Sequence, residues 1–409
     1  MKFKLYPKLC FIALMLVLFS SCHNLFNDDD EEPVNEYLIN YELQRTYLPV
    51  IMETIFDQLT DEYPDIESIR DRVSYGIMVF KITYNTTFNG EDQMASGLVC
   101  VPIGEGEFPV ISYQNGTNTL HSNAPSENPN RDLYMMLEFV ASTGFVISIP
   151  DYLGFGSSDN MFHPYLHKES TLQSVIDMMR AVREFAVAED IILKNEFYIT
   201  GYSMGGWATM QLQKALEEQH SGEFNLVASA PCAGPYDLDY INEYIRNRTT
   251  YPMPYFLGFI ANSYVNAGEM TIPLDAIFNE PYASKIPDLF DGSKSGEEIN
   301  DELTTNIADL LTADYLQNFE TDTIYSSLKE ALERNSISAW NTSVPSKIIH
   351  GTSDDFVPYQ ISQNIYNNFI SKGVSSNKVN LIPLNDLNHT EGIIPAGLIS
   401  INWFLSLTE

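Results

Sequence analysis

The chain is poor in basic residues and in charge overall. It has 22 lysines and arginines against 55 aspartates and glutamates, which gives a formal net charge of -33. A phosphate backbone would be repelled by that balance, which argues against nucleic acid as a partner. Charged residues make up only 19% of the 409 residues and hydrophobic residues 44%, so the chain is globular and can bury a large core.

Cysteine is scarce, with 4 in the whole chain. Two of them fall in the N-terminal segment, and no metal-ligand spacing joins the other two, Cys100 and Cys232, to a histidine. Both lie in apolar, strand-like surroundings, which favours buried free thiols over a disulfide. Phosphate-binding glycine loops and metal-ligand clusters are missing as well, so we expect no cofactor and no metal.

Long apolar runs are missing except near the start. Three lysines within the first eight residues precede the apolar run Leu9–Phe19, and small residues follow it up to Cys22. The run is shorter than the roughly 20 residues that a membrane span needs, but it suits the core of a signal peptide. The segment resembles a bacterial lipoprotein signal, residues 1–21, with Cys22 as the acylated residue; a plain secretory signal is the alternative.

An acidic stretch follows at residues 22–33 and includes the run Asp28–Glu32. Like charges in a row repel one another and stay solvated, which favours a flexible tether over a cation site. The stretch also resembles the acidic signals that send some Gram-negative lipoproteins to the outer face of the cell. We therefore expect a cell-envelope protein, surface exposed on the outer membrane, that touches the membrane only through its N-terminal lipid.

From about residue 73, short apolar runs alternate with helical stretches. The predicted strands lie at 73–84, 95–103, 109–116, 144–152, 195–203, 225–234, 346–354 and 378–386. The predicted helices lie at 132–142, 169–188, 205–218, 359–372 and 391–407. Near-continuous hydrophobic strands interleaved with helices are typical of an α/β protein whose mainly parallel sheet is covered on both faces.

One interval interrupts this alternation. Residues 235–340 separate two strands that a single crossover helix would normally join, so we predict an inserted, largely helical cap. The core then has two parts, residues 73–234 and 341–409. Residues 34–72 look like a peripheral helical segment.

The stretch "YITGYSMGG" carries the first chemical signal, with Ser203 between Gly201 and Gly205. The residues before it predict a strand and those after it a helix. That is the setting of a nucleophile elbow, in which a strained turn lifts the serine above the sheet and glycines allow strand and helix to close together. A tight turn without catalytic function is the alternative.

A serine nucleophile needs a base, which a carboxylate orients. The loop of the strand "SKIIHGTSDD" offers Asp354 and Asp355, and the loop after the last strand offers His389. Asp386 is a weaker candidate for the acid. The order serine, aspartate, histidine is that of the α/β-hydrolases.

Five other histidines outside the signal region compete with His389 for the role of base. Three of them lie in loops after strands and could line the site, one precedes the acid loop, and one ends a polar helix: His121, His163, His167, His350 and His220. None lies in the terminal strand-to-helix loop where the base is needed, which favours His389.

Residues 95–405 resemble an α/β-hydrolase. The phrase His-Gly-x-x-Asp-x-x-Val-Pro, which begins at His350, implies that the acid is Asp354. More narrowly, "PVISYQNGT", "PDYLGFGSS", "HPYL" and "GYSMGG" resemble the secretory lipase-like branch of capped serine esterases and lipases. The resemblance implies an oxyanion hole made by the backbone N–H groups of Met204 and Asn115, although Gly116 and Thr117 also stand as donors because relatives often have His-Gly where this chain has Asn115-Gly116.

Some aromatic and acidic residues have two readings. Tyr251, Tyr255, Phe256 and Phe259 in the cap could form a core stripe or an acyl pocket, and their residue types favour the core. For Trp207, just after the elbow, we predict a role in packing and not in substrate binding. Asp151 and Tyr152 follow a strand and could face the site or serve only the turn.

Together these features predict a lipid-anchored serine hydrolase that cleaves small-molecule or lipid carboxylic esters through an acyl-enzyme. A serine peptidase on the same fold, of aminopeptidase or dipeptidyl type, is the first alternative. A surface binding protein on an inactive hydrolase scaffold is the second, and the complete set of Ser203, Asp354 and His389 argues against it.

Overall fold

A nine-stranded sheet forms the centre of the computed structural model, which describes residues 35–408. The predicted signal peptide at residues 1–21, the lipidation site Cys22 and the tether at residues 22–33 lie outside the described residues. The strands are β1 (Leu38–Tyr47), β2 (Gly76–Phe88), β3 (Glu91–Ile103), β4 (Glu107–Gln114), β5 (Val146–Pro150), β6 (Ile192–Tyr202), β7 (Leu226–Cys232), β8 (Ser346–Gly351) and β9 (Val379–Leu384).

The strand order in the sheet is β1-β2-β3-β5-β4-β6-β7-β8-β9. The strands from β5 to β9 in this order pair in parallel, whereas β1, β2, β3 and β5 pair antiparallel. The prediction of an α/β fold with a mainly parallel sheet is confirmed. All the parallel strands bring their carboxyl ends to one edge, where the ligand sites of such sheets lie.

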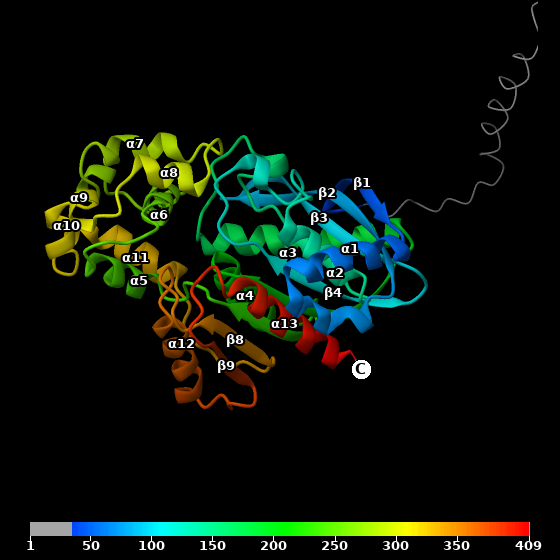
Figure 1. The fold of residues 1–409 in the computed structure, drawn as a ribbon. Coiled ribbons are helices and arrows are strands. Elements are labelled where there is room, and N and C mark those ends of the chain that lie inside the picture. Colours follow the sequence, from blue (N-terminus) through cyan, green and yellow to red (C-terminus); the bar gives the residue numbers. More distant parts are fainter. Residues whose placement is uncertain (1–34, 409) are drawn as a thin grey trace, which may run out of the picture. The chain divides into compact units, whose positions relative to one another are not determined.

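Helices cover both faces of the sheet (Figure 1). In β3, Leu98 and Cys100 join the apolar cluster on one face, and Val99 and Val101 join the cluster on the other. Helices α1 (Pro49–Glu62), α2 (Asp132–Ala141) and α13 (Ile393–Leu407) pack on the first face, and α3 (Lys168–Ala188), α4 (Met204–Glu218) and α12 (Gln360–Ser371) pack on the second. Short 3-10 helices complete the core: η1 (Pro64–Arg72), η2 (His121–Asn123) and η3 (Gly156–Ser158).

The prediction that residues 34–72 are helical is wrong in its first half. Residues Leu38–Tyr47 form the edge strand β1, paired antiparallel with β2, and only α1 and η1 are helical. Tyr41 packs edge-on against Phe80 and Phe185, and Arg45 pairs with the buried Glu138 of α2. These contacts are distant in sequence, and most of the strand is exposed, so no clear two-residue period marks it.

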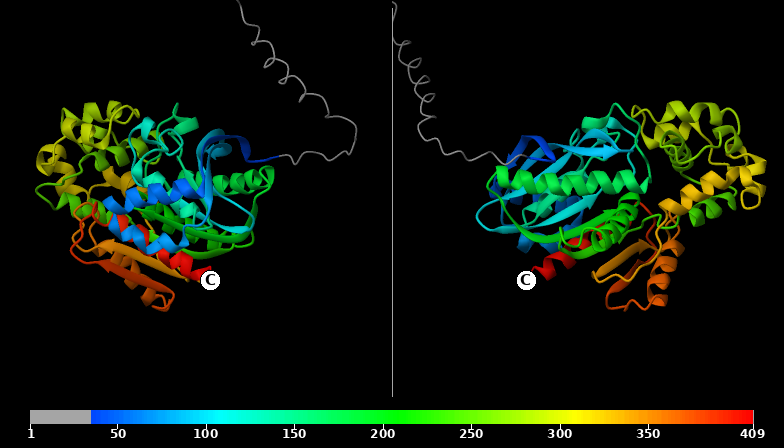
Figure 2. Two further views of the ribbon diagram at one scale, coloured as in Figure 1. Left: turned by 45° about the vertical axis from the view of Figure 1, so that its right-hand side comes forward. Right: turned by 180° about the vertical axis from the view of Figure 1, so that it is seen from behind.

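The interval between β7 and β8 is largely helical, as predicted for residues 235–340. Its elements are α5 (Leu238–Arg246), α6 (Tyr255–Asn266), η4 (Leu274–Ala276), α7 (Tyr282–Leu289), α8 (Gly296–Glu302), α9 (Ile307–Leu310), α10 (Ala313–Asn318), η5 (Thr323–Tyr325) and α11 (Ser326–Asn335). Figures 1 and 2 show α6 to α10 gathered beside the sheet in every view. Residues Glu36–Glu409 nevertheless form one compact unit.

Both remaining cysteines, Cys100 and Cys232, are buried free thiols, which confirms the expectation. Burial raises the pKa of Cys232 to about 12, so its thiol stays protonated at neutral pH. Within residues 35–408, no helix has the length and apolar character that crossing a membrane would require.

Candidate active site

Ser203 stands alone between the end of β6 and the start of α4. Its backbone has φ 60° and ψ -124°, a strained conformation for a residue with a side chain. A Cβ on either Gly201 or Gly205 would collide with the carbonyl oxygen of Gln114 in the neighbouring strand β4. Glycine is therefore needed at both places for the strand, turn and helix to close as they do.

Ser203, His389 and Asp354 come together at the carboxyl edge of the sheet. His389 Nε2 lies 2.9 Å from Ser203 Oγ, and His389 Nδ1 lies 2.6 Å from Asp354 Oδ2. A carboxylate oxygen can only accept, so the Nδ1–H of His389 donates to Asp354 and leaves Nε2 to accept from the Ser203 hydroxyl. The serine is half-buried, while the histidine and the aspartate are buried.

The carboxylate of Asp354 is held on both of its oxygens. The backbone N–H groups of Phe356 and Val357 donate to Oδ1, at 2.9 and 2.8 Å. Burial alone would raise the pKa of Asp354, but hydrogen bonds from His350 and His389 outweigh it and lower the pKa to about 2. The group is therefore a carboxylate across the neutral range.

The His389 ring is also fixed by its neighbours. Tyr202 precedes the serine, and its hydroxyl donates to the backbone oxygen of His389 at 2.7 Å. The rings of Tyr202 and Phe356 lie 5.2 and 5.0 Å from the imidazole, measured between centroids. The competing carboxylates Asp355 and Asp386 are exposed, and neither contacts this ring among the described hydrogen bonds and ion pairs.

The loop after β4, which carries Asn115, packs directly against the start of α4. The Asn115 side chain donates to the backbone oxygen of Pro150 at 2.6 Å, and its own backbone oxygen accepts from the Tyr152 hydroxyl at 3.3 Å. Thr117 hydrogen bonds to the Tyr165 hydroxyl at 2.8 Å. This loop is thus fixed from two sides, next to the first residue of α4, Met204.

Asp151 does not reach the serine. It is buried and accepts hydrogen bonds from the hydroxyls of Ser96 and Ser126, both at 2.6 Å, and from the N–H of Ser126 at 2.8 Å. It therefore ties the loop after β5 to β3. The hydroxyl of its neighbour Tyr152 donates to the backbone oxygen of Asn115.

The remaining histidines occupy structural positions. His163 is buried and its Nδ1–H donates to the backbone oxygen of Leu153 at 2.7 Å, and His167 caps α3 by accepting from the N–H of Ser170. His121 lies beside Gly292 of the cap. His350 alone contacts the group around Ser203, because its Nε2 lies 3.0 Å from Asp354 Oδ2. The sequence offered no signal for that contact beyond its place in the His-Gly-x-x-Asp phrase.

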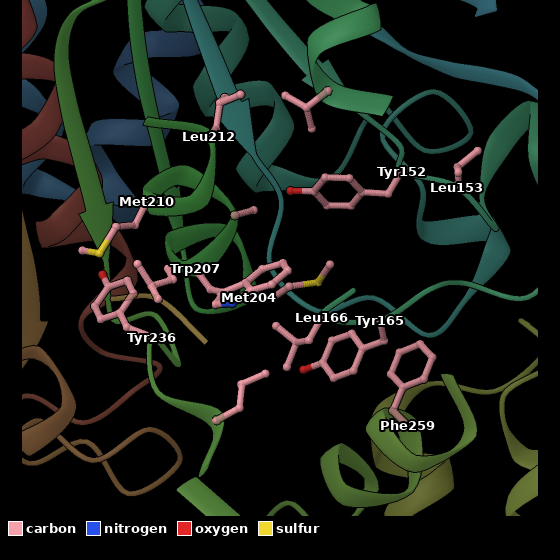
Figure 3. Packing of buried hydrophobic residues seen from close by; sticks show 14 of the residues in the cluster. Tyr152, Leu153, Tyr165, Leu166, Met204, Trp207, Met210, Leu212, Tyr236 and Phe259 are labelled. Carbon is pink, nitrogen blue, oxygen red and sulfur yellow. The ribbon is translucent and has the colours of Figure 1, made fainter. Parts of the chain in front are cut away.

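The aromatic residues of the cap that the sequence singles out lie in α6 and just before it. Tyr251, Tyr255 and Phe259 are buried core residues, whereas Phe256 is half-buried. Phe259 stacks on Tyr165 with 4.4 Å between ring centroids, and Figure 3 shows this pair in the same buried region as Met204 and Trp207. The prediction that these aromatic residues belong to the core is confirmed for all but Phe256.

Trp207 joins the elbow helix to the end of the cap. Its Nε1–H donates to the backbone oxygen of Asn335, the last residue of α11, at 2.8 Å. Gln211, one turn further along α4, donates to the same oxygen at 3.1 Å. The indole is fully buried, so it packs in the core as predicted. Within residues 35–408, no three His, Cys, Asp or Glu side chains are grouped as a metal site.

Comparison with known proteins agrees with this arrangement. The sequence model of the family described as Secretory lipase matches residues 128–404. A protein from Legionella pneumophila described as a hydrolase is 25% identical, with a TM-score of 0.80 over 90% of this chain and 97% of that one. No curated protein sequence matches.

Two further solved structures share the fold. The rice cell wall degrading esterase LipA from Xanthomonas oryzae is 24% identical, with a TM-score of 0.76 over 92% of this chain and 98% of that one. Candida antarctica lipase A in its closed state is 16% identical, with a TM-score of 0.65 over 90% and 81%. At these identities the two structures support the fold alone, and the family match carries the activity. The chain belongs to the secretory lipase family and is a carboxylic ester hydrolase with the α/β-hydrolase fold.

Proposed function

We propose that Ser203 is the nucleophile of this ester hydrolase, that His389 is its general base and that Asp354 orients the base. The observation that carries the proposal is the continuous chain of hydrogen bonds from Ser203 Oγ through both ring nitrogens of His389 to Asp354 Oδ2. Serine is a weak nucleophile at neutral pH, and this arrangement supplies the base that it needs.

In the acylation step, His389 Nε2 takes the hydroxyl proton while Ser203 Oγ attacks the ester carbonyl. The carbonyl oxygen becomes an oxyanion, and we assign its stabilisation to the backbone N–H groups of Met204 and Asn115. Met204 is the first residue of α4, where the N–H groups of a helix lack acceptors within the helix. The ionised Asp354 stabilises the imidazolium that forms.

The tetrahedral intermediate then collapses. The imidazolium gives its proton to the alkoxide leaving group, and the alcohol departs. The acyl group remains bound to Ser203 as an ester, which is the acyl-enzyme. Water repeats the sequence: His389 takes a proton from it, its oxygen attacks the acyl carbon, and the acid is released while Ser203 regains its hydrogen.

We further propose that the enzyme works at the cell surface, anchored by acylation of Cys22. The support is the order of basic start, apolar run and cysteine in the sequence, followed by the acidic stretch. Replacing Cys22 with alanine should move the protein from the membrane fraction to the soluble fraction and abolish its labelling by radioactive palmitate. Unchanged labelling in that variant would refute the anchor.

The catalytic proposal is tested on the form that starts after Cys22. A panel of p-nitrophenyl esters of graded chain length and a panel of aminoacyl amides are compared in the wild type, Ser203→Ala and the matched control Ser406→Ala, whose hydroxyl lies on the exposed end of α13. We expect ester turnover and fluorophosphonate labelling in the wild type and the control. Both should fall at least a thousandfold in Ser203→Ala.

The other outcomes decide against the proposal. Ester turnover that survives Ser203→Ala would place the nucleophile elsewhere. Turnover of amides without esters would favour a peptidase. Failure of both the label and every substrate would favour a binding protein.

A further inference from the structure

Two imidazole rings contact the same carboxylate oxygen of Asp354. Oδ2 lies 2.6 Å from His389 Nδ1 and 3.0 Å from His350 Nε2. The His350 ring is fully buried, and its Nδ1 lies 2.6 Å from the hydroxyl oxygen of Ser362 in the first turn of α12. A buried chain of polar side chains therefore continues past the aspartate, away from Ser203.

The acceptors around His350 fix where its hydrogen sits. Nε2 lies 3.0 Å from the backbone oxygen of Val357 as well as from Asp354 Oδ2, and both of these oxygens can only accept. Nε2 must therefore carry a hydrogen, shared between them. In the neutral ring Nδ1 then accepts, and the Ser362 hydroxyl is its donor.

We propose that His350 is a positioning residue for the hydrolytic reaction, which holds the Asp354 carboxylate in the orientation and charge state that His389 requires. The inference rests on the proposed roles of Ser203, His389 and Asp354. The backbone N–H groups of Phe356 and Val357 fix Oδ1, but they leave Oδ2 bound to His389 alone unless His350 donates to it.

Two consequences follow from this arrangement. Without the His350 donor the carboxylate can rotate about its Oδ1 contacts, which misplaces the imidazole relative to Ser203. The charge on Oδ2 would also face His389 without a second compensating hydrogen bond, which favours the protonated form of the base. If His350 only filled space, its replacement by an apolar side chain of similar size would produce neither effect. Such a side chain fills the same space but donates no hydrogen bond.

The test compares His350→Gln, whose side-chain amide can donate from near the place of Nε2, with His350→Leu, which keeps the volume and donates nothing. In folded His350→Leu we expect kcat to fall about ten- to hundredfold with KM nearly unchanged. The acid limb of kcat/KM should move upward by about half a pH unit to one unit. His350→Gln should restore most of kcat and return the limb to its wild-type position.

Ser174→Ala is the matched control, because it removes a fully buried hydroxyl on α3 that bonds only to the backbone oxygen of Thr171. It should leave kcat and the acid limb unchanged. Circular dichroism and thermal unfolding check that each variant is folded. Wild-type turnover together with its loss in Ser203→Ala tests the catalytic proposal separately, so a failure of that proposal is distinguished from a failure of the role assigned to His350.

Two outcomes would overturn the inference. One is a folded His350→Leu enzyme with wild-type kcat and acid limb, and the other is equal impairment of the Leu and Gln variants with an unmoved limb. If His350→Leu fails to fold, the inference is tested on the wild type instead. The 15N NMR signals of its histidine rings at a pH of about 8 show which ring nitrogen of His350 carries the hydrogen. A neutral His350 ring with hydrogen on Nε2 supports the role, and hydrogen on Nδ1 refutes it.

Discussion

Two buried aspartates follow parallel strands at the same edge of the sheet, and their partners differ. Asp151 follows β5 and accepts from the hydroxyls of Ser96 and Ser126. Asp354 follows β8 and accepts from two imidazoles, one of which, His389, contacts the serine of the elbow. A position after a strand therefore brings a carboxylate to the functional edge, and the neighbouring side chain decides what it can do there.

The two groups also differ in their charge. Burial raises the pKa of Asp151, and the serine hydrogen bonds offset this only in part. Burial acts in the same direction on Asp354, but the hydrogen bonds from His350 and His389 lower its pKa to about 2. Asp151 is thus suited to hold two loops together, and Asp354 is suited to stabilise a developing positive charge.

The largest expected effect is that of Asp354→Asn on turnover. An amide can still occupy the site, but it no longer stabilises the imidazolium and can favour the wrong tautomer of His389. We expect kcat to fall by roughly a thousand- to ten-thousandfold. Steady-state kinetics with a p-nitrophenyl ester measure this directly.

Two other substitutions test whether the effect of an aspartate depends on its place after a strand or on the side chains that it contacts. Asp355→Asn changes the exposed neighbour and should leave kcat within about twofold of the wild type, since surface changes of this kind are usually small. Asp151→Asn should lower kcat less than tenfold, because Asp151 touches the site only through the loop that it holds. A loss in Asp151→Asn as large as that in Asp354→Asn would remove the distinction drawn above.

The group formed by Ser203, Asp354 and His389 was predictable from the sequence. Ser203 lies in a short strand, turn and helix, and the loops of Asp354 and His389 each follow an apolar strand, so local patterns in the right order predict the group. The parallel sheet then brings the strand ends together. The core elements were predictable for the same reason, because their apolar periods are local.

Other features depend on contacts between distant segments. Strand β1 is stabilised by pairing with β2 and by Tyr41 packing on Phe185, and neither contact leaves a pattern in residues 34–72. The contact between His350 and Asp354 spans only four residues, but the His350 ring that makes it is also held by Ser362 of α12, which a motif does not specify. Propensity and period describe single elements, so they carry no information on these pairings.

Gly205→Ala should break the other side of the site, where the loop of Asn115 meets α4. A Cβ at position 205 would collide with the backbone oxygen of Gln114 and crowd that of Asn115, and backbone atoms cannot move aside cheaply. We expect a stability loss of about 1 to 3 kcal/mol and a fall in kcat of about tenfold or more, because the loop that carries the proposed oxyanion donor Asn115 would shift. Thermal unfolding and ester kinetics measure the two effects.

Gly397→Ala is the matched control on α13. A Cβ there has nothing within 4 Å, and the residue is exposed, so the helix should gain up to about 1 kcal/mol with kcat unchanged. Equal behaviour of the two variants would mean that the close approach of strand and helix at the elbow does not require glycine.

The smallest expected effect is a difference in how the two aspartates make stability depend on pH. The folded-state pKa of Asp354, about 2, lies below the ordinary value of about 4. Its contribution, about 2 kcal/mol, is therefore present above pH 4 and lost as the pH falls through about 2. The folded-state pKa of Asp151 is raised, so its contribution is fully present below about pH 4 and is lost as the pH rises from there through the raised pKa.

Thermal unfolding of the wild type, Asp354→Asn and Asp151→Asn between pH of about 3 and 8 compares these two signs. As the pH rises, the Tm of Asp354→Asn should fall relative to the wild type, because the variant lacks a contribution that the wild type gains. The Tm of Asp151→Asn should rise relative to the wild type, because the amide avoids the cost of a buried charge. The same substitution would then have opposite slopes at two carboxylates on one sheet edge, and parallel slopes would show that burial outweighs the partners at both.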